Sequence, residues 1–286
     1  MVMLTKDFNG NSFADSVGCD DTLYQVLTEA NIRNSKNFDT IFLINGQEGA
    51  GKTEFAKYCG ILLNKNLSLD NVVFNGEQFL EAVNKADDFS VIIYDEADDL
   101  SNHWADKLLQ LLKKSMKRIR KKNLYIFLVT PTMFDLNKYF VLHRTLAVFE
   151  IFLGRNFERG FWRLWNRKDK RLLYINGKRY NDMGAWKPSA SGRFQKVPDW
   201  FDGFTEDDYE DKKDDALIEL TPEAKEKAST LRHQRIGRMD VINRLQDYFK
   251  REGLTREEQS SILKINNRSY YDYLSELKEN GGVPKK

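Results

Sequence analysis

The fold of this chain is decided by the stretch Gly46-Gln47-Glu48-Gly49-Ala50-Gly51-Lys52-Thr53. It follows the apolar run 40–44 and precedes the helix-forming run 54–57, so the expected order is strand, glycine loop, helix. Glycines let backbone N–H groups turn inward around an anion, and the N-terminal end of the helix adds partial positive charge. The spacing Gly-x-x-x-x-Gly-Lys-Ser/Thr therefore predicts a loop that binds the phosphates of a nucleoside triphosphate.

The residues of this loop have separate expected roles. Lys52 is expected to reach the β- and γ-phosphates, and the hydroxyl of Thr53 to ligate Mg²⁺. Further nucleotide contacts are expected from Gly46, Gln47, Glu48, Gly49, Ala50, Gly51 and Glu54.

A second acidic motif follows an apolar run at 91–94, where Asp95 and Glu96 come in succession. A carboxylate at the end of a strand near the phosphate loop can hold the Mg²⁺ shell, and Asp95 is assigned that role. The next acid can polarise a water for attack on the γ-phosphate, which makes Glu96 the candidate catalytic base. Coming soon after a phosphate loop, the pair indicates hydrolysis more than a solvated strand end.

The composition is that of a soluble globular protein. The chain has 286 residues, of which 41% are hydrophobic and 31% charged, and its net charge is only +2. Two distant cysteines, Cys19 and Cys59, fit neither a disulfide framework nor a metal site and are typical of a reducing compartment. No apolar run is long enough to cross a membrane and no signal peptide is visible, so we expect a cytoplasmic location without a membrane partner.

Apolar runs and helical patterns alternate from residue 40 onward. Strands are expected at 40–45, 71–75, 90–95, 123–130 and 146–153, and helices at 52–63, 76–86, 101–121 and 134–141. Such alternation predicts an α/β fold with a parallel sheet flanked by helices, and the continuous apolar strands indicate burial on both faces.

Outside this core the pattern changes. The expected organisation is an N-terminal arm and helix at 1–37, the nucleotide-binding domain at 38–204, a charged linker at 205–220 and a helical domain at 221–286. Residues 1–18 are expected to be irregular. Runs at 161–165 and 171–175 are expected to form an antiparallel β-hairpin, followed by ordered coil at 181–204. Thr221 and Pro222 are expected to begin a long helix.

Two further residues are candidates for the catalytic site. Thr130 ends the fourth apolar strand and could sense the γ-phosphate, although a cap or turn hydroxyl would have the same position. Arg144 precedes the fifth strand and could stabilise charge on the phosphate, in its own or a neighbouring subunit; a surface arginine is the alternative.

The order of these motifs resembles known motor ATPases. With Glu96 as base, the chain resembles the additional-strand, catalytic-glutamate division of P-loop ATPases, and ATP is the expected nucleotide. Residues 38–180 resemble the HerA/FtsK superfamily, in particular its zonula occludens toxin-type ATPase domains. The resemblance implies a ring-forming ATPase that translocates or packages DNA. Family members often carry Gln at the place of Thr130, and the transmembrane segment of the filamentous-phage relatives is not visible.

The C-terminal residues resemble a DNA-binding motif. Thr255 and Glu258 form a capping box before a short helix, and a second amphipathic helix is expected at 268–278. The pattern at 259–277 resembles the helix-turn-helix of transcription regulators and recombinases. By that match the major groove is contacted by Asn267, Arg268, Ser269, Tyr271 and Asp272. A helical hairpin used for packing or oligomerisation shows the same pattern.

The sequence thus favours an oligomeric, DNA-associated ATPase motor that uses ATP and Mg²⁺, such as one from a virus or mobile element. Two alternatives stay open: an AAA+-like or other non-motor switch or loader that binds DNA through its helix-turn-helix, and an ATPase for a protein partner whose C-terminal helices mediate assembly. The β-hairpin expected after the fifth strand favours the first over an AAA+ protein, where a helical lid would follow.

Overall fold

The computed structural model describes residues 1–95, 115–219, 242–246, 248–263, 270 and 274. The chain divides into two compact units, Met1–Lys213 and Asp214–Lys286. Within the described residues, no helix is both long and apolar enough to cross a membrane.

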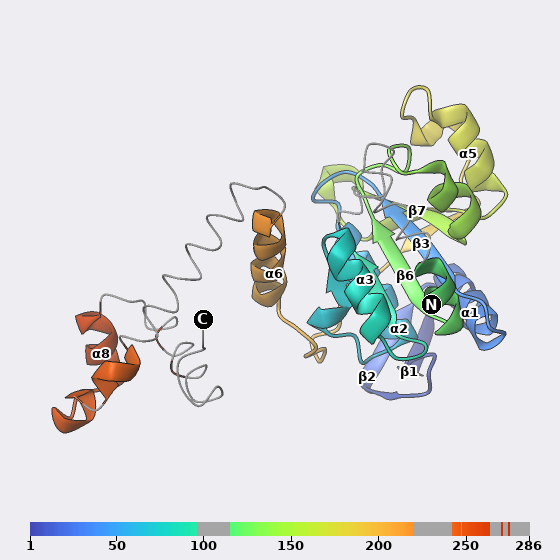
Figure 1. Ribbon diagram of the computed structural model, residues 1–286. Helices are drawn as coiled ribbons and strands as arrows, with labels where there is room; N and C mark the ends of the chain where they lie inside the picture. Colours follow the sequence, from blue (N-terminus) through green and yellow to red (C-terminus); the bar gives the residue numbers. More distant parts are fainter. Residues whose placement is uncertain (96–114, 220–241, 247, 264–269, 271–273, 275–286) are drawn as a thin grey trace. The chain divides into compact units, whose positions relative to one another are not determined.

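A seven-stranded sheet organises the first unit, in the order β4-β5-β6-β3-β7-β8-β9. Its strands β3, β6 and β7 are labelled in Figure 1. The strands are β3 (Thr40–Asn45), β4 (Val72–Val73), β5 (Val91–Tyr94), β6 (Tyr125–Val129), β7 (Ala147–Phe152), β8 (Phe161–Trp165) and β9 (Ala190–Arg193). Those from β4 to β7 are parallel, whereas β8 and β9 are antiparallel to their neighbours. The expected α/β fold is confirmed, and each of the five parallel strands lies within the range expected for it.

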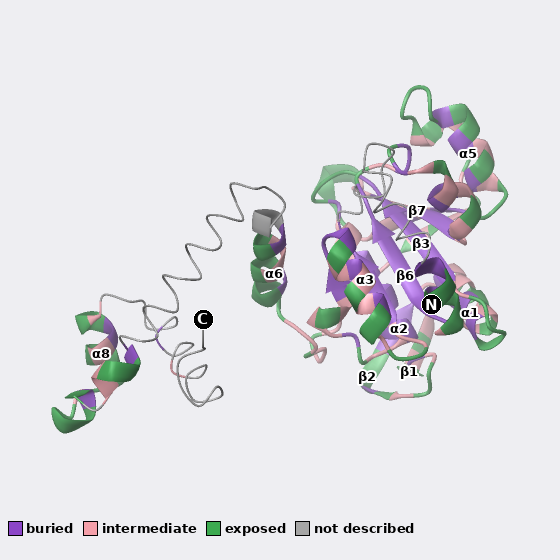
Figure 2. Cartoon of the chain, in the orientation of Figure 1, coloured by how far each residue is buried: buried purple, intermediate pink, exposed green. Residues whose placement is uncertain are grey.

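Both faces of the sheet are covered by helices, and β3 and β6 are apolar at every position except Thr40 and Asn45, the two ends of β3. Every residue of these two strands is buried (Figure 2). On one face, Ile41 and Leu43 belong to the same buried hydrophobic cluster as Phe79 and Val83 of helix α3 (Gly76–Lys85). Such continuous burial is what distinguishes a central parallel strand from an alternating surface strand.

The other face carries two long helices, α1 (Asp21–Ser35) and α2 (Lys52–Leu63). The ring of Phe55 in α2 lies 4.9 Å from the ring of Phe149 in β7, and Tyr125 in β6 donates a hydrogen bond to Asn31 in α1. The bounds of α2 agree with the expected helix 52–63, which begins directly at the end of the glycine loop.

The strand β6 lies between β3 and β5. β3 therefore neighbours neither β4 nor β5, the two strands that follow it in the chain, and the carboxyl ends of β3 and β5 are separated by one strand. This is the arrangement that the additional-strand division predicts. It brings the phosphate loop, Asp95 and Thr130 to the same edge of the sheet.

The antiparallel hairpin is built from other segments than we expected. The partners of β8 are β7 and β9, and residues 171–175 are not a strand but part of helix α5 (Asp169–Gly177). Its buried residues, Lys170, Leu173, Tyr174 and Gly177, recur at helical spacing, and this period outweighs the β-propensity of the run.

The start of α5 is fixed by Asn166, whose side chain accepts hydrogen bonds from the backbone of Lys168 and Asp169. Lys170 is fully buried and donates to Val141 O and to both oxygens of Thr145. These carbonyls belong to the end of the π-helix η3 (Tyr139–Arg144), which replaces the helix expected at 134–141. Lys170 therefore ties the start of α5 to the end of η3, where Val141 O also accepts a hydrogen bond from Thr145 Oγ1.

The expectation of an irregular arm at 1–18 is wrong. Strands β1 (Val2–Lys6) and β2 (Ser12–Cys19) form a separate antiparallel sheet. The turn contains Gly10 at φ +90°, and Asp7 accepts hydrogen bonds from the backbone and side chain of Asn11. An Asn-Gly pair between short strands was the sequence signal for this hairpin.

The segment 181–204 is also more regular than expected. It contains β9 and the 3-10 helix η5 (Met183–Ala185), and further 3-10 helices lie at η1 (Leu69–Asn71) and η4 (Arg155–Phe157). The charged residues expected to form a linker include helix α6 (Glu206–Glu219).

In the C-terminal unit, α8 (Arg256–Ile262) has the expected capping box between Thr255 and Glu258. Tyr270 is fully buried, and its hydroxyl bonds with Gln259 of α8 and Gln246. The turn and most of the second helix of the expected helix-turn-helix lie outside the described residues, as does the helix start at Thr221.

Candidate functional site

The glycine loop leaves the carboxyl end of β3 and ends at the first residue of α2. Gly46 has φ +144°, and a Cβ atom placed there would lie 2.1 Å from the carbonyl oxygen of Ile151 in β7. A side chain is therefore excluded at this position by the neighbouring strand. Gly51, the N-cap of α2, is left-handed at φ +95° and directs the chain into the helix.

Lys52 folds back over the loop that precedes it. Its Nζ donates to Gly46 O at 2.9 Å and to Gln47 O at 3.2 Å. The amine thus lies inside the curve of the loop, where it adds a full positive charge to the N-terminal end of α2.

Thr53 and Asp95 meet across the edge of the sheet. Thr53 Oγ1 donates to Asp95 Oδ2 at 2.8 Å, although 42 residues separate them in sequence. Asp95 is buried, and its backbone N–H donates to Val73 O at 2.9 Å. The hydroxyl and the carboxylate that we assigned to Mg²⁺ are therefore adjacent.

These two oxygen-bearing side chains fit a hard divalent cation. Mg²⁺ prefers hydroxyl, carboxylate, water and phosphate oxygens, and commonly uses one or two protein ligands together with nucleotide phosphates. Thr53 and Asp95 supply such a set beside the loop.

A cleft of about 1240 Å³ opens over this edge. Its lining contains six of the residues expected to bind nucleotide, together with Asp95 and Thr130. The six are Glu48, Gly49, Gly51, Lys52, Thr53 and Glu54. The cleft thus unites the phosphate loop with the acidic strand end. Glu54 also accepts a hydrogen bond from the backbone of Val197, which ties the segment after β9 to α2.

Thr130 lies in this cleft at the carboxyl end of β6. Its backbone N–H donates to Ile44 O at 3.0 Å, and its hydroxyl donates to Thr132 O at 3.2 Å. The side chain therefore combines the position of a phosphate sensor with a hydrogen bond inside a turn.

Arg144 lies at the other edge of the sheet. It precedes β7 and forms an ion pair with Asp39, the residue just before β3. Since the glycine loop follows the opposite end of β3, Arg144 is separated from the loop of its own chain by the length of the strand. The structure does not bring Arg144 together with Lys52 and Asp95.

Several cleft residues were not expected from the sequence. Lys57, Arg159, Phe194, Lys196 and Tyr209 line or border the site, and Tyr209 bonds directly to Asp95. A single tyrosine within the acidic run 206–211 was the one available signal, and it was interpreted as part of a linker. The remaining candidates, Glu96 and the DNA-contact set Asn267, Arg268, Ser269, Tyr271 and Asp272, lie outside the described residues.

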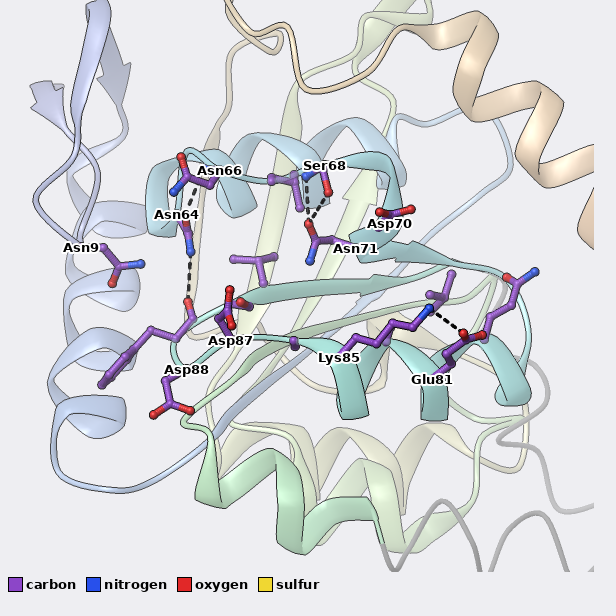
Figure 3. A pocket seen from close by; sticks show the side chains of 18 of the residues that line it. Asn9, Asn64, Asn66, Ser68, Asp70, Asn71, Glu81, Lys85, Asp87 and Asp88 are labelled. Atoms are coloured by element: carbon purple, nitrogen blue, oxygen red, sulfur yellow. Dashed lines mark hydrogen bonds and ion pairs between the residues drawn. The ribbon is translucent and has the colours of Figure 1, made fainter. Parts of the chain in front are cut away.

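A second cleft, of about 950 Å³, lies between the residues that follow α2 and those that precede β5 (Figure 3). Its lining is polar, but the side chains are largely engaged in local structure: Ser68 and Asn71 close a capping box, and Lys85 pairs with Glu81. It lies at the end of the sheet away from the glycine loop and has none of the catalytic pairs found there.

A five-stranded parallel core with an inserted strand, a Gly-x-x-x-x-Gly-Lys-Thr loop before α2 and an adjacent strand-end aspartate define the architecture. This is the P-loop NTPase fold. The P-loop is residues 46–53, and Asp95, which directly follows β5, is the acidic residue beside it.

No protein-family model and no curated protein matches the sequence. Among solved structures, the N-terminal domain of zonular occludens toxin from Neisseria meningitidis is 17% identical, with 45% of this chain and 84% of that chain covered and a TM-score of 0.33. B204, the DNA-packaging ATPase of Sulfolobus turreted icosahedral virus, is 14% identical, with 47% of this chain and 95% of that chain covered and a TM-score of 0.34.

AMPPCP-bound DnaA from Aquifex aeolicus is 15% identical over 87% of this chain and 74% of that one, with a TM-score of 0.33. Likenesses of this size give no argument about activity. The assignment of the fold therefore depends on the strand order and P-loop of this chain itself.

The P-loop geometry predicts that Gly46→Ala is far more damaging than Gly49→Ala. Both positions have positive φ, but a Cβ at Gly46 meets Ile151 O at 2.1 Å, whereas nothing lies within 4 Å of one at Gly49. Thermal unfolding should show a loss of roughly 1–2 kcal/mol for Gly49→Ala, the cost of a left-handed alanine, and a clearly larger loss for Gly46→Ala. Equal losses would contradict the close approach of the loop to β7.

Proposed function

We propose that this protein binds ATP with Mg²⁺ and hydrolyses it. The observation that supports this most directly is the 2.8 Å hydrogen bond between Thr53 Oγ1 and Asp95 Oδ2, beside Lys52 and a loop whose glycine cannot carry a side chain. A structural glycine turn would not require a lysine amine inside the loop together with a buried carboxylate at the neighbouring strand end.

The proposed mechanism assigns one role to each group. P-loop backbone N–H groups and Lys52 hold the β- and γ-phosphates, while Thr53 and Asp95 hold the metal. Mg²⁺ supplies positive charge that offsets the charge of the phosphates. Glu96, which directly follows Asp95, orients a water in line with the γ-phosphorus and removes its proton. Thr130 is proposed to contact the γ-phosphate or position that water.

Arg144 can contribute to such a site only from a neighbouring subunit, because its own P-loop lies at the opposite edge of the sheet. In this proposal the chain forms a closed ring, with Arg144 of one copy reaching the nucleotide of the next. The ion pair with Asp39 would then either orient the guanidinium toward the interface or be exchanged for the phosphate.

We further propose that ATP hydrolysis serves work on DNA, namely translocation, packaging or replication, with residues 255–279 as a helix-turn-helix. Its first helix, α8, has the expected capping box, and Tyr270 packs on α8 through Gln259. A non-motor ATPase that binds DNA through the same motif is the second candidate, and an ATPase for a protein partner with assembly helices is the third. The buried Tyr270 fits all three.

Two substitutions test ATP hydrolysis. Lys52→Ala should abolish ATP binding or turnover because it removes the cation inside the P-loop. Glu96→Gln should bind ATP yet hydrolyse it roughly 10²–10⁴-fold more slowly, because the amide cannot accept the water proton. Fluorescent-nucleotide binding and phosphate release measure the two steps, with the exposed Lys85→Ala as control. Full turnover in Lys52→Ala would refute the site, and normal turnover in Glu96→Gln would remove Glu96 as base.

The role in DNA work is tested by ATPase rates with and without single- and double-stranded DNA. We expect DNA to raise the rate, and Arg268→Ala to weaken specific DNA binding by about 1–3 kcal/mol because a base contact is lost. Lys250→Ala removes the same charge from an exposed position in the same unit and serves as the matched control. If DNA neither raises the ATPase rate nor binds to the protein, the result favours the ATPase for a protein partner. Stimulation without movement along DNA would favour the switch or loader.

A further inference from the structure

Tyr209, in the first turn of α6, reaches into the P-loop site. Its side chain is only 3% exposed, and its hydroxyl donates a hydrogen bond to Asp95 Oδ2. The two residues are 114 positions apart in sequence. No step of the proposed hydrolysis uses this tyrosine.

The bond falls on the atom that matters for the metal. Asp95 Oδ2 accepts from Thr53 Oγ1 and from Tyr209 at once, while the backbone N–H of Asp95 is held by Val73 O. A carboxylate with two hydroxyl donors on one oxygen has a fixed rotation about its Cβ–Cγ bond. The orientation of the carboxylate proposed to bind the metal is therefore determined jointly by α2 and α6.

The position of Tyr209 is itself held by several contacts. Its ring lies 5.4 Å from that of Phe74, next to β4, and the ammonium of Lys57 lies 4.2 Å from the ring centroid. The buried Lys57, in α2, also pairs with Glu206 at 2.9 Å. Ring packing and a cation–π contact hold the phenol independently of its hydroxyl.

The next turn of α6 is anchored in the same way. Lys212 Nζ donates at 2.7 Å to the carbonyl oxygens of Leu69 and Val72, at the entry to β4. Contacts one turn apart thus fix the rotation of α6 about its axis, so that Tyr209 points at Asp95.

We propose that Tyr209 is a positioning residue of the Mg²⁺–nucleotide site, which orients the Asp95 carboxylate for the metal through the hydrogen bond to Oδ2. The inference depends on the proposed ATP site. The Tyr209 hydroxyl, on helix α6, belongs to neither the P-loop nor the Asp95-Glu96 motif. Outer partners of metal ligands commonly change metal affinity or activity by 10–100-fold when they are removed.

The test is a Mg²⁺ titration of fluorescent-ATP binding to the full chain, with wild type compared with Tyr209→Phe. Phenylalanine keeps the ring contacts with Phe74 and Lys57 and removes only the hydroxyl. We expect the half-saturating Mg²⁺ concentration to rise roughly 10-fold or more, with nucleotide binding in EDTA and the unfolding temperature little changed. Tyr180→Phe, at a tyrosine that is 73% exposed, is the control and should match wild type.

An unchanged Mg²⁺ requirement in Tyr209→Phe would overturn the inference. A lower requirement would overturn it as well, since it would mean that the hydroxyl competes with the metal for Asp95. A second comparison separates action through Asp95 from a general loss of stability. In an Asp95→Asn background, Tyr209→Phe should cause no further loss of Mg²⁺-dependent binding. An additive loss would contradict action through Asp95. If wild type itself shows no Mg²⁺-dependent nucleotide binding, the proposed function fails; if only the variant comparison fails, the role of Tyr209 alone is rejected.

Discussion

The hydrogen bond between Thr53 and Asp95 joins the two halves of the site, and most of the first unit is arranged around it. Thr53 lies in the first turn of α2, and Asp95 directly follows β5, so the bond requires α2 to cross the face of the sheet over β6. That crossing in turn requires strands buried on both faces and a loop that can turn sharply at the end of β3. Because the loop packs so closely on β7, Ile151 leaves no room for a side chain at Gly46.

The site also extends beyond the P-loop core. Helix α6 contributes Tyr209 to Asp95 and Glu206 to Lys57, and it continues across the boundary between the two units at 213 and 214. Asp95 is thus shared by a catalytic-core hydroxyl and a hydroxyl from the helix that leads into the C-terminal unit.

The parallel core could be predicted because its signals are local and agree with one another. Apolar runs, helix periodicity and the loop spacing all specify the same elements, and α2 begins where Lys52 predicts. The errors have the opposite cause. The run 171–175 has strand propensity, but Lys170 and Leu173 are buried at helical spacing against η3, so tertiary packing outweighed propensity. Tyr209 was missed because its partner lies 114 residues away and nothing near it in sequence indicates burial.

The most direct test of the account is whether the Thr53 hydroxyl is needed for metal-dependent nucleotide binding. Thr53→Val keeps the shape and removes the hydroxyl, whereas Thr53→Ser keeps the hydroxyl and removes a methyl group. Calorimetric titration with ATP should show that Mg²⁺ strengthens binding to wild type and to Thr53→Ser but not to Thr53→Val. Equal strengthening of all three would contradict the account, because the hydrogen-bonded pair of Thr53 and Asp95 would then not be the metal site.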